Sequence, residues 1–398
     1  MRERAKLCPP GEALAEQALP YNWVMNAFDV EVAGSGVVGQ VLALALGRLG
    51  LRVALRRDVA ASDPSAGPDL RAFALNPASV ALLRTLKVWD ALPLHAATAV
   101  YDMRVHGDAP GATLEFSAWE QQVGALAWIT DAAVLERELA AALRFAPHVT
   151  ALAVGAAPTG AALTAVCEGA SSALREAFGA GFRAYEYGHR AIAARLTSTR
   201  PHQGVAWQWF GPAEVLALLP FDSPEPERSY ALVWSVSDAR ADELRAMDGA
   251  EFERALAAAT AGAAGELALA SGRVAWPLRL GRAERVSGHG WVLLGDAAHV
   301  VHPLAGQGLN LGLADVTSLT RVIERREPWR DLGDEKLLRR YDRDRAAPTW
   351  AVGEVTDGLQ RLFSHPSPAL RELRNRGLNL VNRLPPVKRW LTSHALGN

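Results

Sequence analysis

One segment of the sequence, residues 290–315, combines residue types that can bind a polar, redox-active ligand. An apolar run at 291–294 predicts a buried strand, which ends in front of a single carboxylate, Asp296. A rigid turn then leads into an amphipathic helix and contains Pro303, Gly306 and Gly308. Backbone N–H groups at a helix N-terminus favour negative charge. The carboxylate and these N–H groups together suit a ligand with sugar hydroxyls and an electron-rich ring.

A second glycine-rich turn lies near the start of the chain. A predicted strand at 28–33 is followed by the glycines of a G-x-G-x-x-G pattern, Gly34, Gly36 and Gly39. An amphipathic helix and another strand, at 51–55, come next. This is the βαβ dinucleotide fingerprint in its required context, where glycines permit a tight turn and a close approach of backbone to a pyrophosphate. The three glycines are therefore predicted to bind the nucleotide part of a cofactor.

The 290–315 segment closely resembles the second flavin-binding motif of the FAD-dependent aromatic hydroxylases of the para-hydroxybenzoate hydroxylase superfamily. It is most similar to the branch that hydroxylates ring precursors of ubiquinone. The resemblance implies that Asp296 holds a ribityl hydroxyl of FAD. It also implies that a Pro-x-x-Gly-Gln-Gly backbone lies along the isoalloxazine, here Pro303, Gly306, Gln307 and Gly308. The fold it implies is α/β: a Rossmann-like FAD-binding domain of the glutathione-reductase type, with an inserted β-sheet substrate domain and a helical C-terminus.

Two segments between these motifs resemble further motifs of the family. The segment containing Arg71 lies near FAD and the entering nicotinamide in the family, and Asn76 with the following proline predicts a helix start. The alternative for Arg71 is a solvated arginine before a helix. The pair Glu168-Gly169 resembles the Asp-Gly motif, whose acid meets the FAD and NAD(P)H regions, although here glutamate replaces aspartate and Ser171 replaces the usual asparagine. The alternative for this pair is a plain turn between a strand and a helix.

The nucleotide motif departs from its pattern in several places. The acidic residue that would hold the adenosine ribose is absent, because the spacing places Arg57 there, after Arg56. Asp58 is the nearest carboxylate and is our candidate for this contact. Two alternatives remain open: backbone groups make the contact in its place, or FAD binds loosely. The arginine pair would suit a 2′-phosphate, but nothing else supports resident NADP.

Glu31, inside a strand expected to be buried, predicts a strand end that reaches solvent. The chain between 152 and 163 is too short for the β-hairpin usual in the family.

Composition excludes several classes of protein. The chain has 398 residues, of which 49% are hydrophobic and 21% charged, as in a globular protein. A net charge of −1 argues against nucleic-acid binding through a basic surface. Cys8 and Cys167 lie far apart, so we expect no disulfide framework and a reducing cytoplasm. No apolar run approaches the ~20 residues of a membrane helix. His299 and His302 have no third ligand at suitable spacing, so we expect no metal site.

The sequence divides the chain into four parts. The first 27 residues lack a signal-peptide core and are expected to be a disordered extension, with translation starting at Met1 or Met25. Residues 28–182 and 279–345 are assigned to a discontinuous FAD-binding domain, although part of 96–150 also fits the substrate domain. The remaining parts are 183–278 and 346–398.

These last two parts differ in character. Short β-like runs dominate 183–278, the expected substrate domain, where four tryptophans suit either an aromatic cavity or ordinary sheet packing: Trp207, Trp209, Trp234 and Trp276. Residues 346–398 are expected to form a helical segment with a basic end. This segment would dock on a partner, lie on an anionic membrane surface, or pack on its own domain with a solvated basic face.

The resemblance implies a complete activity. Reduced flavin would react with O₂ to give a flavin hydroperoxide that attacks an electron-rich phenol. A single G-x-G-x-x-G suits resident FAD with NAD(P)H as a transient reductant. We expect a lipophilic phenolic substrate of ubiquinone biosynthesis and a cytoplasmic location. Subunits of a quinone-biosynthesis complex and a peripheral membrane contact are the expected partners. No catalytic base is identified.

Two alternatives stay open. One is a flavin hydroxylase or reductase acting on another aromatic or isoprenoid substrate. The other is a catalytically weak flavin-fold scaffold subunit of a quinone-biosynthesis complex, suggested by Arg57, Glu168 and the missing hairpin.

Overall fold

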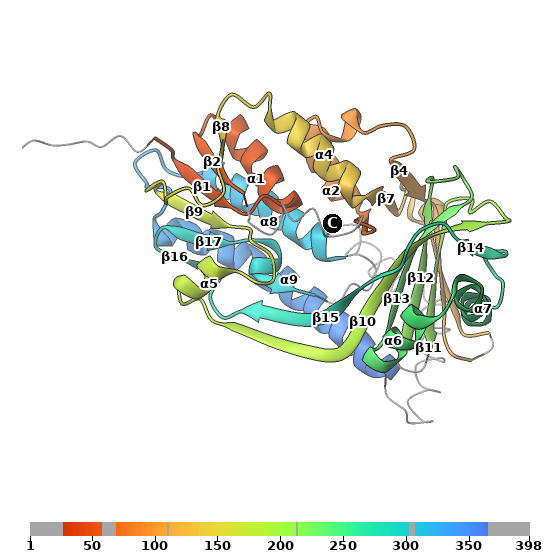
Figure 1. The fold of residues 1–398 in the computed structure, drawn as a ribbon. Coiled ribbons are helices and arrows are strands. Elements are labelled where there is room, and N and C mark those ends of the chain that lie inside the picture. Colours follow the sequence, from red (N-terminus) through yellow and green to blue (C-terminus); the bar gives the residue numbers. More distant parts are fainter. Residues whose placement is uncertain (1–26, 58–68, 110, 212–213, 302–306, 365–398) are drawn as a thin grey trace, which may run out of the picture.

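The computed structural model describes residues 27–57, 69–109, 111–211, 214–301 and 307–364 (Figure 1). Several sequence predictions fall outside these ranges. They concern the N-terminal extension up to residue 26, the basic C-terminal end at 365–398, and Asp58, His302, Pro303 and Gly306.

A six-stranded sheet forms the first half of the molecule, in the order β16-β17-β9-β1-β2-β8. Its strands are β1 (Val30–Ala33), β2 (Val53–Arg56), β8 (Val149–Leu152), β9 (Leu163–Val166), β16 (Ser287–Gly288) and β17 (Trp291–Leu293). All neighbours pair in parallel except β16 and β17. The predicted βαβ unit is therefore present, with β1 and β2 joined through a crossover helix, α1 (Val37–Arg48).

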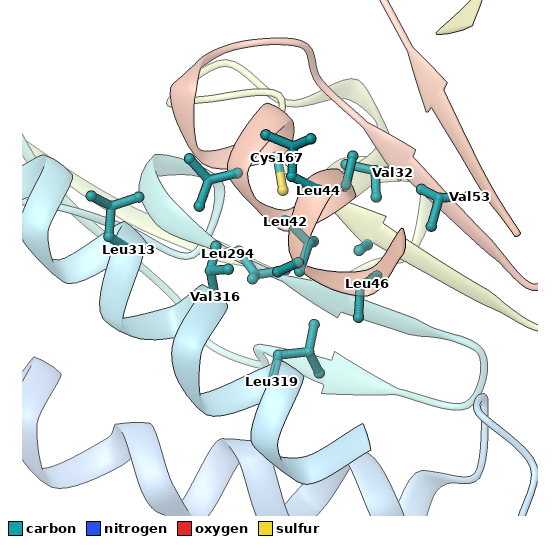
Figure 2. Packing of buried hydrophobic residues seen from close by; sticks show 14 of the residues in the cluster. Val32, Leu42, Leu44, Leu46, Val53, Cys167, Leu294, Leu313, Val316 and Leu319 are labelled. Atoms are coloured by element: carbon teal, nitrogen blue, oxygen red, sulfur yellow. The ribbon is translucent and has the colours of Figure 1, made fainter. Parts of the chain in front are cut away.

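Helices cover this sheet and form the main hydrophobic core (Figure 2). They include α2 (Pro77–Thr85), α4 (Ala132–Leu143), α8 (Gln307–Glu324) and α9 (Glu335–Ser364). Helix α1 is buried along almost its whole length because it packs on the sheet and against α4 and α8, and its Leu42 and Leu46 share a cluster with Val316. Asn76 caps α2 through its side-chain oxygen, which confirms the predicted helix start.

A nine-stranded sheet forms the second half, in the order β18-β15-β10-β13-β12-β11-β5-β6, with β14 beside β10. Its strands are β5 (Asp102–His106), β6 (Thr113–Ser117), β10 (Phe182–Ser198), β11 (Val205–Gly211), β12 (Glu214–Phe221), β13 (Ser229–Ser237), β14 (Leu267–Leu269), β15 (Val274–Ala283) and β18 (His299–Val300). Two helices lie on its outer side, α6 (Asp238–Ala246) and α7 (Gly249–Thr260). Strands β10 and β15 run back from this sheet towards the parallel sheet (Figure 1).

A small sheet lies between these two halves. It has the order β3-β7-β4, with β3 (Ala72–Leu75), β7 (Ala127–Asp131) and β4 (Ala97–Val100). Its buried residues pack against the inner face of the large sheet, where Ile129 and Val100 share a cluster with Phe221. Short helical segments complete the described fold: η2 (Trp89–Ala91), α3 (Ala118–Gln121), α5 (Ala173–Ala177) and η3 (Gly295–Ala297).

The observed elements differ in part from the predicted divisions. Strand β15 crosses the boundary placed at residue 279, whereas strands β5 and β6, at 102–117, belong to the large sheet, which the sequence left open for part of 96–150. Helix α9 passes without interruption through residue 346, where the C-terminal segment was placed. Residues 153–162 contain no strand, in agreement with their short length. Among the described helices, none has the length and apolar character needed to cross a membrane.

Candidate cofactor site

Three of the predicted motifs meet at one edge of the parallel sheet. Strands β1, β9 and β17 lie side by side in register, with Ala33 beside Val166 and Val166 beside Leu293. The residues that follow these strand ends are Gly34, Glu168 and Asp296. Ligands of open α/β sheets bind beyond the carboxyl ends of the strands. Parallel pairing thus brings together motifs that are more than a hundred residues apart in the sequence.

The three glycines of the first motif have different environments. Gly34 has a φ of +116°, and a Cβ there would lie 2.3 Å from the carbonyl oxygen of Cys167. A Cβ on Gly39 would lie 1.8 Å from the carbonyl oxygen of Gly34. A Cβ on Gly36, by contrast, would meet nothing within 4 Å. Gly34 and Gly39 are therefore required by the packing of the turn, whereas Gly36 borders open space.

That open space lies at the N-terminus of α1. Gly36 is the N-cap residue and provides no side-chain hydrogen bond to the first turn. Free N–H groups and the helix dipole favour an anion at such a position. The first motif therefore provides an open backbone cradle of the kind that a pyrophosphate occupies.

Asp296 lies in η3, directly beyond β17. Its side chain remains accessible to solvent. Desolvation by the surrounding protein raises the pKa of Asp296, and the positive fields of His299 and Arg71 only partly oppose this effect. The carboxylate is thus positioned to accept hydrogen bonds from hydroxyl groups of a ligand, as predicted for a ribityl chain.

Arg71 lies near Asp296 and is held by two other carboxylates. Its guanidinium donates to Asp69 at 2.7 Å and to Glu136 at 3.4 Å. The hydrogen bond to Asp69 is the main reason that the pKa of Arg71 is raised, and Asp296 contributes to the same shift through its charge. Arg71 is half-exposed, so part of its surface is free to meet a ligand, and its charge interacts with that of Asp296.

Glu168 has a structural role that its sequence motif did not reveal. Its carboxylate accepts hydrogen bonds from the Ser172 hydroxyl at 2.7 Å and from the Leu174 N–H at 3.0 Å, at the start of α5. Gly169 has a φ of +84° and borders open space. Contacts of Glu168 and Gly169 with the cofactor, like that of Gln307 and Gly308 at the start of α8, stay predictions.

The prediction for Glu31 was wrong. Its side chain does not reach solvent but forms a buried ion pair with Arg56 at 2.6 Å, and it also accepts from the N–H and hydroxyl of Thr159. The segment 153–162 supplies the missing partner because it folds over this strand end. Since Arg56 is engaged in this pair, no arginine pair is free to bind a 2′-phosphate. Arg57 is exposed.

A buried charged cluster beneath the second motif was missed by the sequence analysis. Asp315 on α8 is completely buried and contacts His299 Nε2 at 2.7 Å, Arg345 Nε at 2.6 Å and the N–H of Gly295 at 2.9 Å. Burial alone would raise the pKa of Asp315, but these three partners outweigh it and lower the pKa. A carboxylate on the apolar face of a helix requires such partners. The position of Asp315 in the sequence could therefore have predicted a buried cluster.

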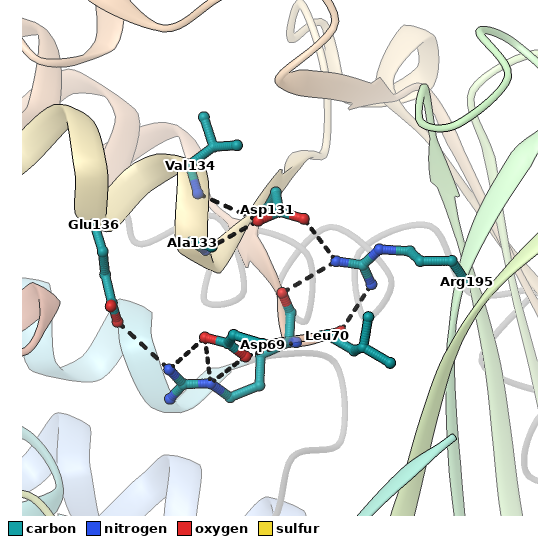
Figure 3. Close-up of polar contacts among 8 residues, drawn as sticks. Asp69, Leu70, Asp131, Ala133, Val134, Glu136 and Arg195 are labelled. Atoms are coloured by element: carbon teal, nitrogen blue, oxygen red, sulfur yellow. Dashed lines mark hydrogen bonds and ion pairs between the residues drawn. The ribbon is translucent and has the colours of Figure 1, made fainter. Parts of the chain in front are cut away.

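A second network ties the Arg71 segment to the large sheet (Figure 3). Arg195 on β10 donates to the carbonyl oxygens of Leu70 and Arg71 and to the carboxylate of Asp131 at 2.9 Å. Asp131 also caps α4 by accepting from two backbone N–H groups. The network therefore fixes the position of Arg71 relative to both halves of the molecule.

The tryptophans divide between the two faces of the large sheet. Trp207, Trp209 and Trp234 belong to the cluster beneath α6 and α7 on the outer face, away from the small sheet. Ordinary sheet packing is therefore the correct interpretation for these three. Trp276 pairs with Ala191 and occupies the inner face, so it remains a candidate for contact with a ligand.

Comparison with known proteins identifies the family. The family described as "FAD binding domain" matches residues 27–356. The chain belongs to this family. Ubiquinone hydroxylase UbiL of Rhodospirillum rubrum is 31% identical, with 93% of this chain and 89% of the relative covered. The 3-demethoxyubiquinol 3-hydroxylase of Escherichia coli is also 31% identical, with 93% and 98% covered.

Solved structures show the same fold. The p-nitrophenol 4-monooxygenase PnpA from Pseudomonas putida has a TM-score of 0.72 at 19% identity, with 93% of this chain and 98% of that chain covered. A variant of HpxO from Klebsiella pneumoniae, solved in complex with FAD, has a TM-score of 0.69 at 17% identity, with 93% and 99% covered.

The predicted family, the α/β fold, FAD as the cofactor and the class of FAD-dependent monooxygenase are confirmed. The observed site also fits FAD on its own chemistry. Open backbone at Gly36 suits the pyrophosphate, and the accessible carboxylate of Asp296 suits a polyhydroxylated chain.

Proposed function

We propose that this protein hydroxylates a lipophilic phenolic ring in ubiquinone biosynthesis, with FAD as resident cofactor and O₂ as cosubstrate. The observation that carries the proposal is the convergence of Gly36, Arg71 and Asp296 at one sheet edge. The names of the relatives supply the pathway, since ubiquinone-ring hydroxylation is the activity given for proteins that match 93% of this chain.

The flavin, when bound, supplies the redox chemistry by taking two electrons from NAD(P)H and activating O₂, so that one oxygen atom enters the ring and the other leaves as water. The chain itself binds and orients the cofactor. Asp296 and the N-terminus of α1 would hold its sugar-alcohol and pyrophosphate parts. Arg71 provides positive charge on the same side, kept in position by Asp69 and by the Arg195 network. The inner face of the large sheet packs against the small sheet, and it would limit the access of water to the bound cofactor.

Location and partners belong to the same proposal. A cytoplasmic protein with a peripheral membrane contact through its basic C-terminal end would reach a substrate dissolved in the bilayer. Association with other quinone-biosynthesis proteins would serve the same purpose. Both could be tested by fractionating cells that express the full chain and a chain truncated after residue 364.

A first experiment separates the proposal from the scaffold alternative. The purified full-length protein is expected to be yellow and to release FAD on denaturation. With NAD(P)H, O₂ and a short-chain prenylphenol, it should form a hydroxylated product of about 16 additional mass units, a value fixed by the added oxygen atom. A protein that stays colourless in excess FAD would favour the scaffold role instead.

A second experiment tests the pathway. Deletion of the gene in its host is expected to cause accumulation of a quinone precursor that lacks one ring hydroxyl. Complementation with the parent gene should restore the quinone, and complementation with an Asp296→Ala variant should not. Normal quinone levels in a deletion strain without a redundant hydroxylase would contradict the pathway assignment and favour another aromatic or isoprenoid substrate.

A further inference from the structure

A glutamine is buried inside the apolar helix α1. Gln40 follows the last glycine of the first motif, and the next six residues of the helix are all valine, leucine or alanine. Its side chain is only 7% exposed. Glutamine is mostly found on protein surfaces, because burying an amide costs free energy unless its polar atoms are paired. The residue at this position therefore calls for a reason beyond helix packing.

Only one end of the Gln40 amide is paired. Its Nε2 donates to the carbonyl oxygen of Ser35 at 2.8 Å. Its Oε1 is buried without a hydrogen-bond partner, a statement that covers the described part of the chain. An unpaired buried oxygen destabilises the folded state. Methionine has a similar length and would fill the same space without this loss, so packing alone does not favour glutamine here.

The contact with Ser35 fixes the direction of one peptide group. In a planar trans peptide the C=O and the N–H point in opposite directions. The Ser35 carbonyl is held towards Gln40, so the N–H of the same peptide, that of Gly36, points away from Gln40. Gly36 is exposed and borders open space, and no protein atom in the described ranges accepts from its N–H. This N–H is therefore available to a ligand.

The backbone of Gln40 fixes the next peptide group as well. Its N–H donates to the carbonyl oxygen of Gly36 at 3.0 Å, which is the first hydrogen bond of α1. The N–H of Val37, in the same peptide as that carbonyl, then points beyond the N-terminus of the helix. One residue thus holds two successive peptide groups. Successive N–H groups form a concave site for an anion, and the helix dipole adds to their effect.

We propose that Gln40 is a positioning residue for the pyrophosphate of FAD. It acts through the Ser35–Gly36 peptide, which it holds so that the Gly36 N–H is directed at the open cradle. The free energy lost at the unpaired Oε1 is the consequence of keeping the amide in this orientation. The inference rests on FAD as the cofactor, which the family establishes, and not on the substrate proposed above.

Two substitutions separate this role from packing. Gln40→Met keeps the length of the side chain but has no donor, so it cannot hold the Ser35 carbonyl, and it also removes the unpaired oxygen. Gln40→Glu has a donor only while its carboxyl group is protonated, and burial raises the pKa of such a group. Below that pKa the carboxyl group can replace the amide. Above it, a carboxylate would repel both the Ser35 carbonyl and the phosphates.

The measurements are fluorescence titration of the full-length apoprotein with FAD and urea unfolding of the same apoprotein. Both are made at about pH 5.5 and about pH 8.5, on either side of the pKa expected for a buried glutamate. Each variant is compared with the parent at the same pH. The control is Gln208→Met, because Gln208 is also buried but lies on β11 in the large sheet. Its FAD affinity should equal that of the parent.

Gln40→Met should weaken FAD binding by about tenfold at both pH values, the effect of losing one well-directed hydrogen bond. Its urea midpoint should stay close to that of the parent, because removal of the unpaired oxygen offsets the lost contact with Ser35. Gln40→Glu should bind FAD almost as well as the parent at the lower pH and more than about tenfold more weakly at the higher pH.

An FAD affinity of Gln40→Met equal to that of the parent would overturn the proposal. If Gln40→Met does not fold, Gln40→Glu decides the matter: the same affinity relative to the parent at both pH values would show that the donor has no role. A parent protein that binds FAD with this dependence on Gln40 but never hydroxylates a quinone precursor would contradict the proposed function and leave the role of Gln40 standing.

Discussion

At the residue scale, Asp296 and Gly36 matter through what surrounds them. Asp296 combines solvent access with a pKa raised by desolvation, and Arg71 lies close enough to feel its charge. Gly36 borders open space in a turn whose other two glycines are tightly packed. The Asp296 carboxylate and the space beside Gly36 are therefore available to a ligand.

We expect Asp296→Asn to weaken FAD binding by about tenfold to a hundredfold, the effect of losing hydrogen bonds to a charged acceptor worth about 1.5–3 kcal/mol. FAD fluorescence titration of the apoprotein would measure the change. The control is Asp29→Asn, since Asp29 pairs with Arg52 on the surface and should leave FAD affinity unaltered. Equal affinities of the parent and Asp296→Asn would refute the ribityl contact.

Alanine at Gly36 and at Gly34 should have opposite consequences. Gly36→Ala is expected to fold, with an unfolding free energy lowered by no more than about 1 kcal/mol through the poorer N-cap, but to lose FAD affinity because its methyl group enters the cradle. Gly34→Ala should destabilise the apoprotein itself, since its methyl group would meet the Cys167 backbone at a positive φ. An unfolding curve of Gly36→Ala shifted as far as that of Gly34→Ala would argue that both glycines serve only packing.

At the element scale, the cluster around Asp315 joins three pieces of the chain. It connects the segment after β17, helix α8 and helix α9 through His299, Arg345 and the Gly295 N–H. Because these contacts hold the backbone beside Asp296, the carboxylate depends on two helices that follow it in sequence. A buried ionic cluster of this kind is strongly destabilised when one partner is removed.

This cluster predicts a pH-dependent stability. The folded pKa of His299 is raised, so its contribution should be complete below the unfolded value of about 6.5 and be lost as the pH rises through the folded pKa. The lowered pKa of Asp315 also contributes to stability, and this contribution is lost only in acid, below about pH 4. The difference in unfolding free energy between the parent and His299→Gln should therefore be larger at about pH 6 than at about pH 9. Urea unfolding at both values tests this, and a constant difference would mean that folding does not raise the pKa of His299.

At the scale of the whole molecule, Arg195 links the large sheet to the FAD-binding half (Figure 3). Its side chain is buried and extends from β10 to the loop before β3 and to the end of β7. It also stacks on Phe221 at 4.3 Å. This guanidinium thus adds a polar link to the apolar packing between the small and large sheets.

We expect Arg195→Met to lower the free energy of unfolding by about 2–3 kcal/mol, because Asp131 and two carbonyl groups lose their partner. FAD affinity should fall as well, since the Arg71 segment loses its anchor. Arg339→Met is the control, because Arg339 forms an exposed pair within α9 that is worth less than about 0.5 kcal/mol. Similar losses in both variants would contradict the linking role.

The sequence by itself determined the two nucleotide motifs, the elements around them and the family. Gly34 and Asp296 belong to short segments in which local pattern and backbone geometry specify a turn. The sequence alone was therefore sufficient to predict both turns. The tertiary structure alone decided which side chains are partners. Glu31 with Arg56, Asp315 with Arg345, and Arg195 with Asp131 are pairs between distant segments, and periodicity carries no information about such pairs. The face of the sheet on which Trp207 lies was likewise set by the register of β11 and by the helices that cover it.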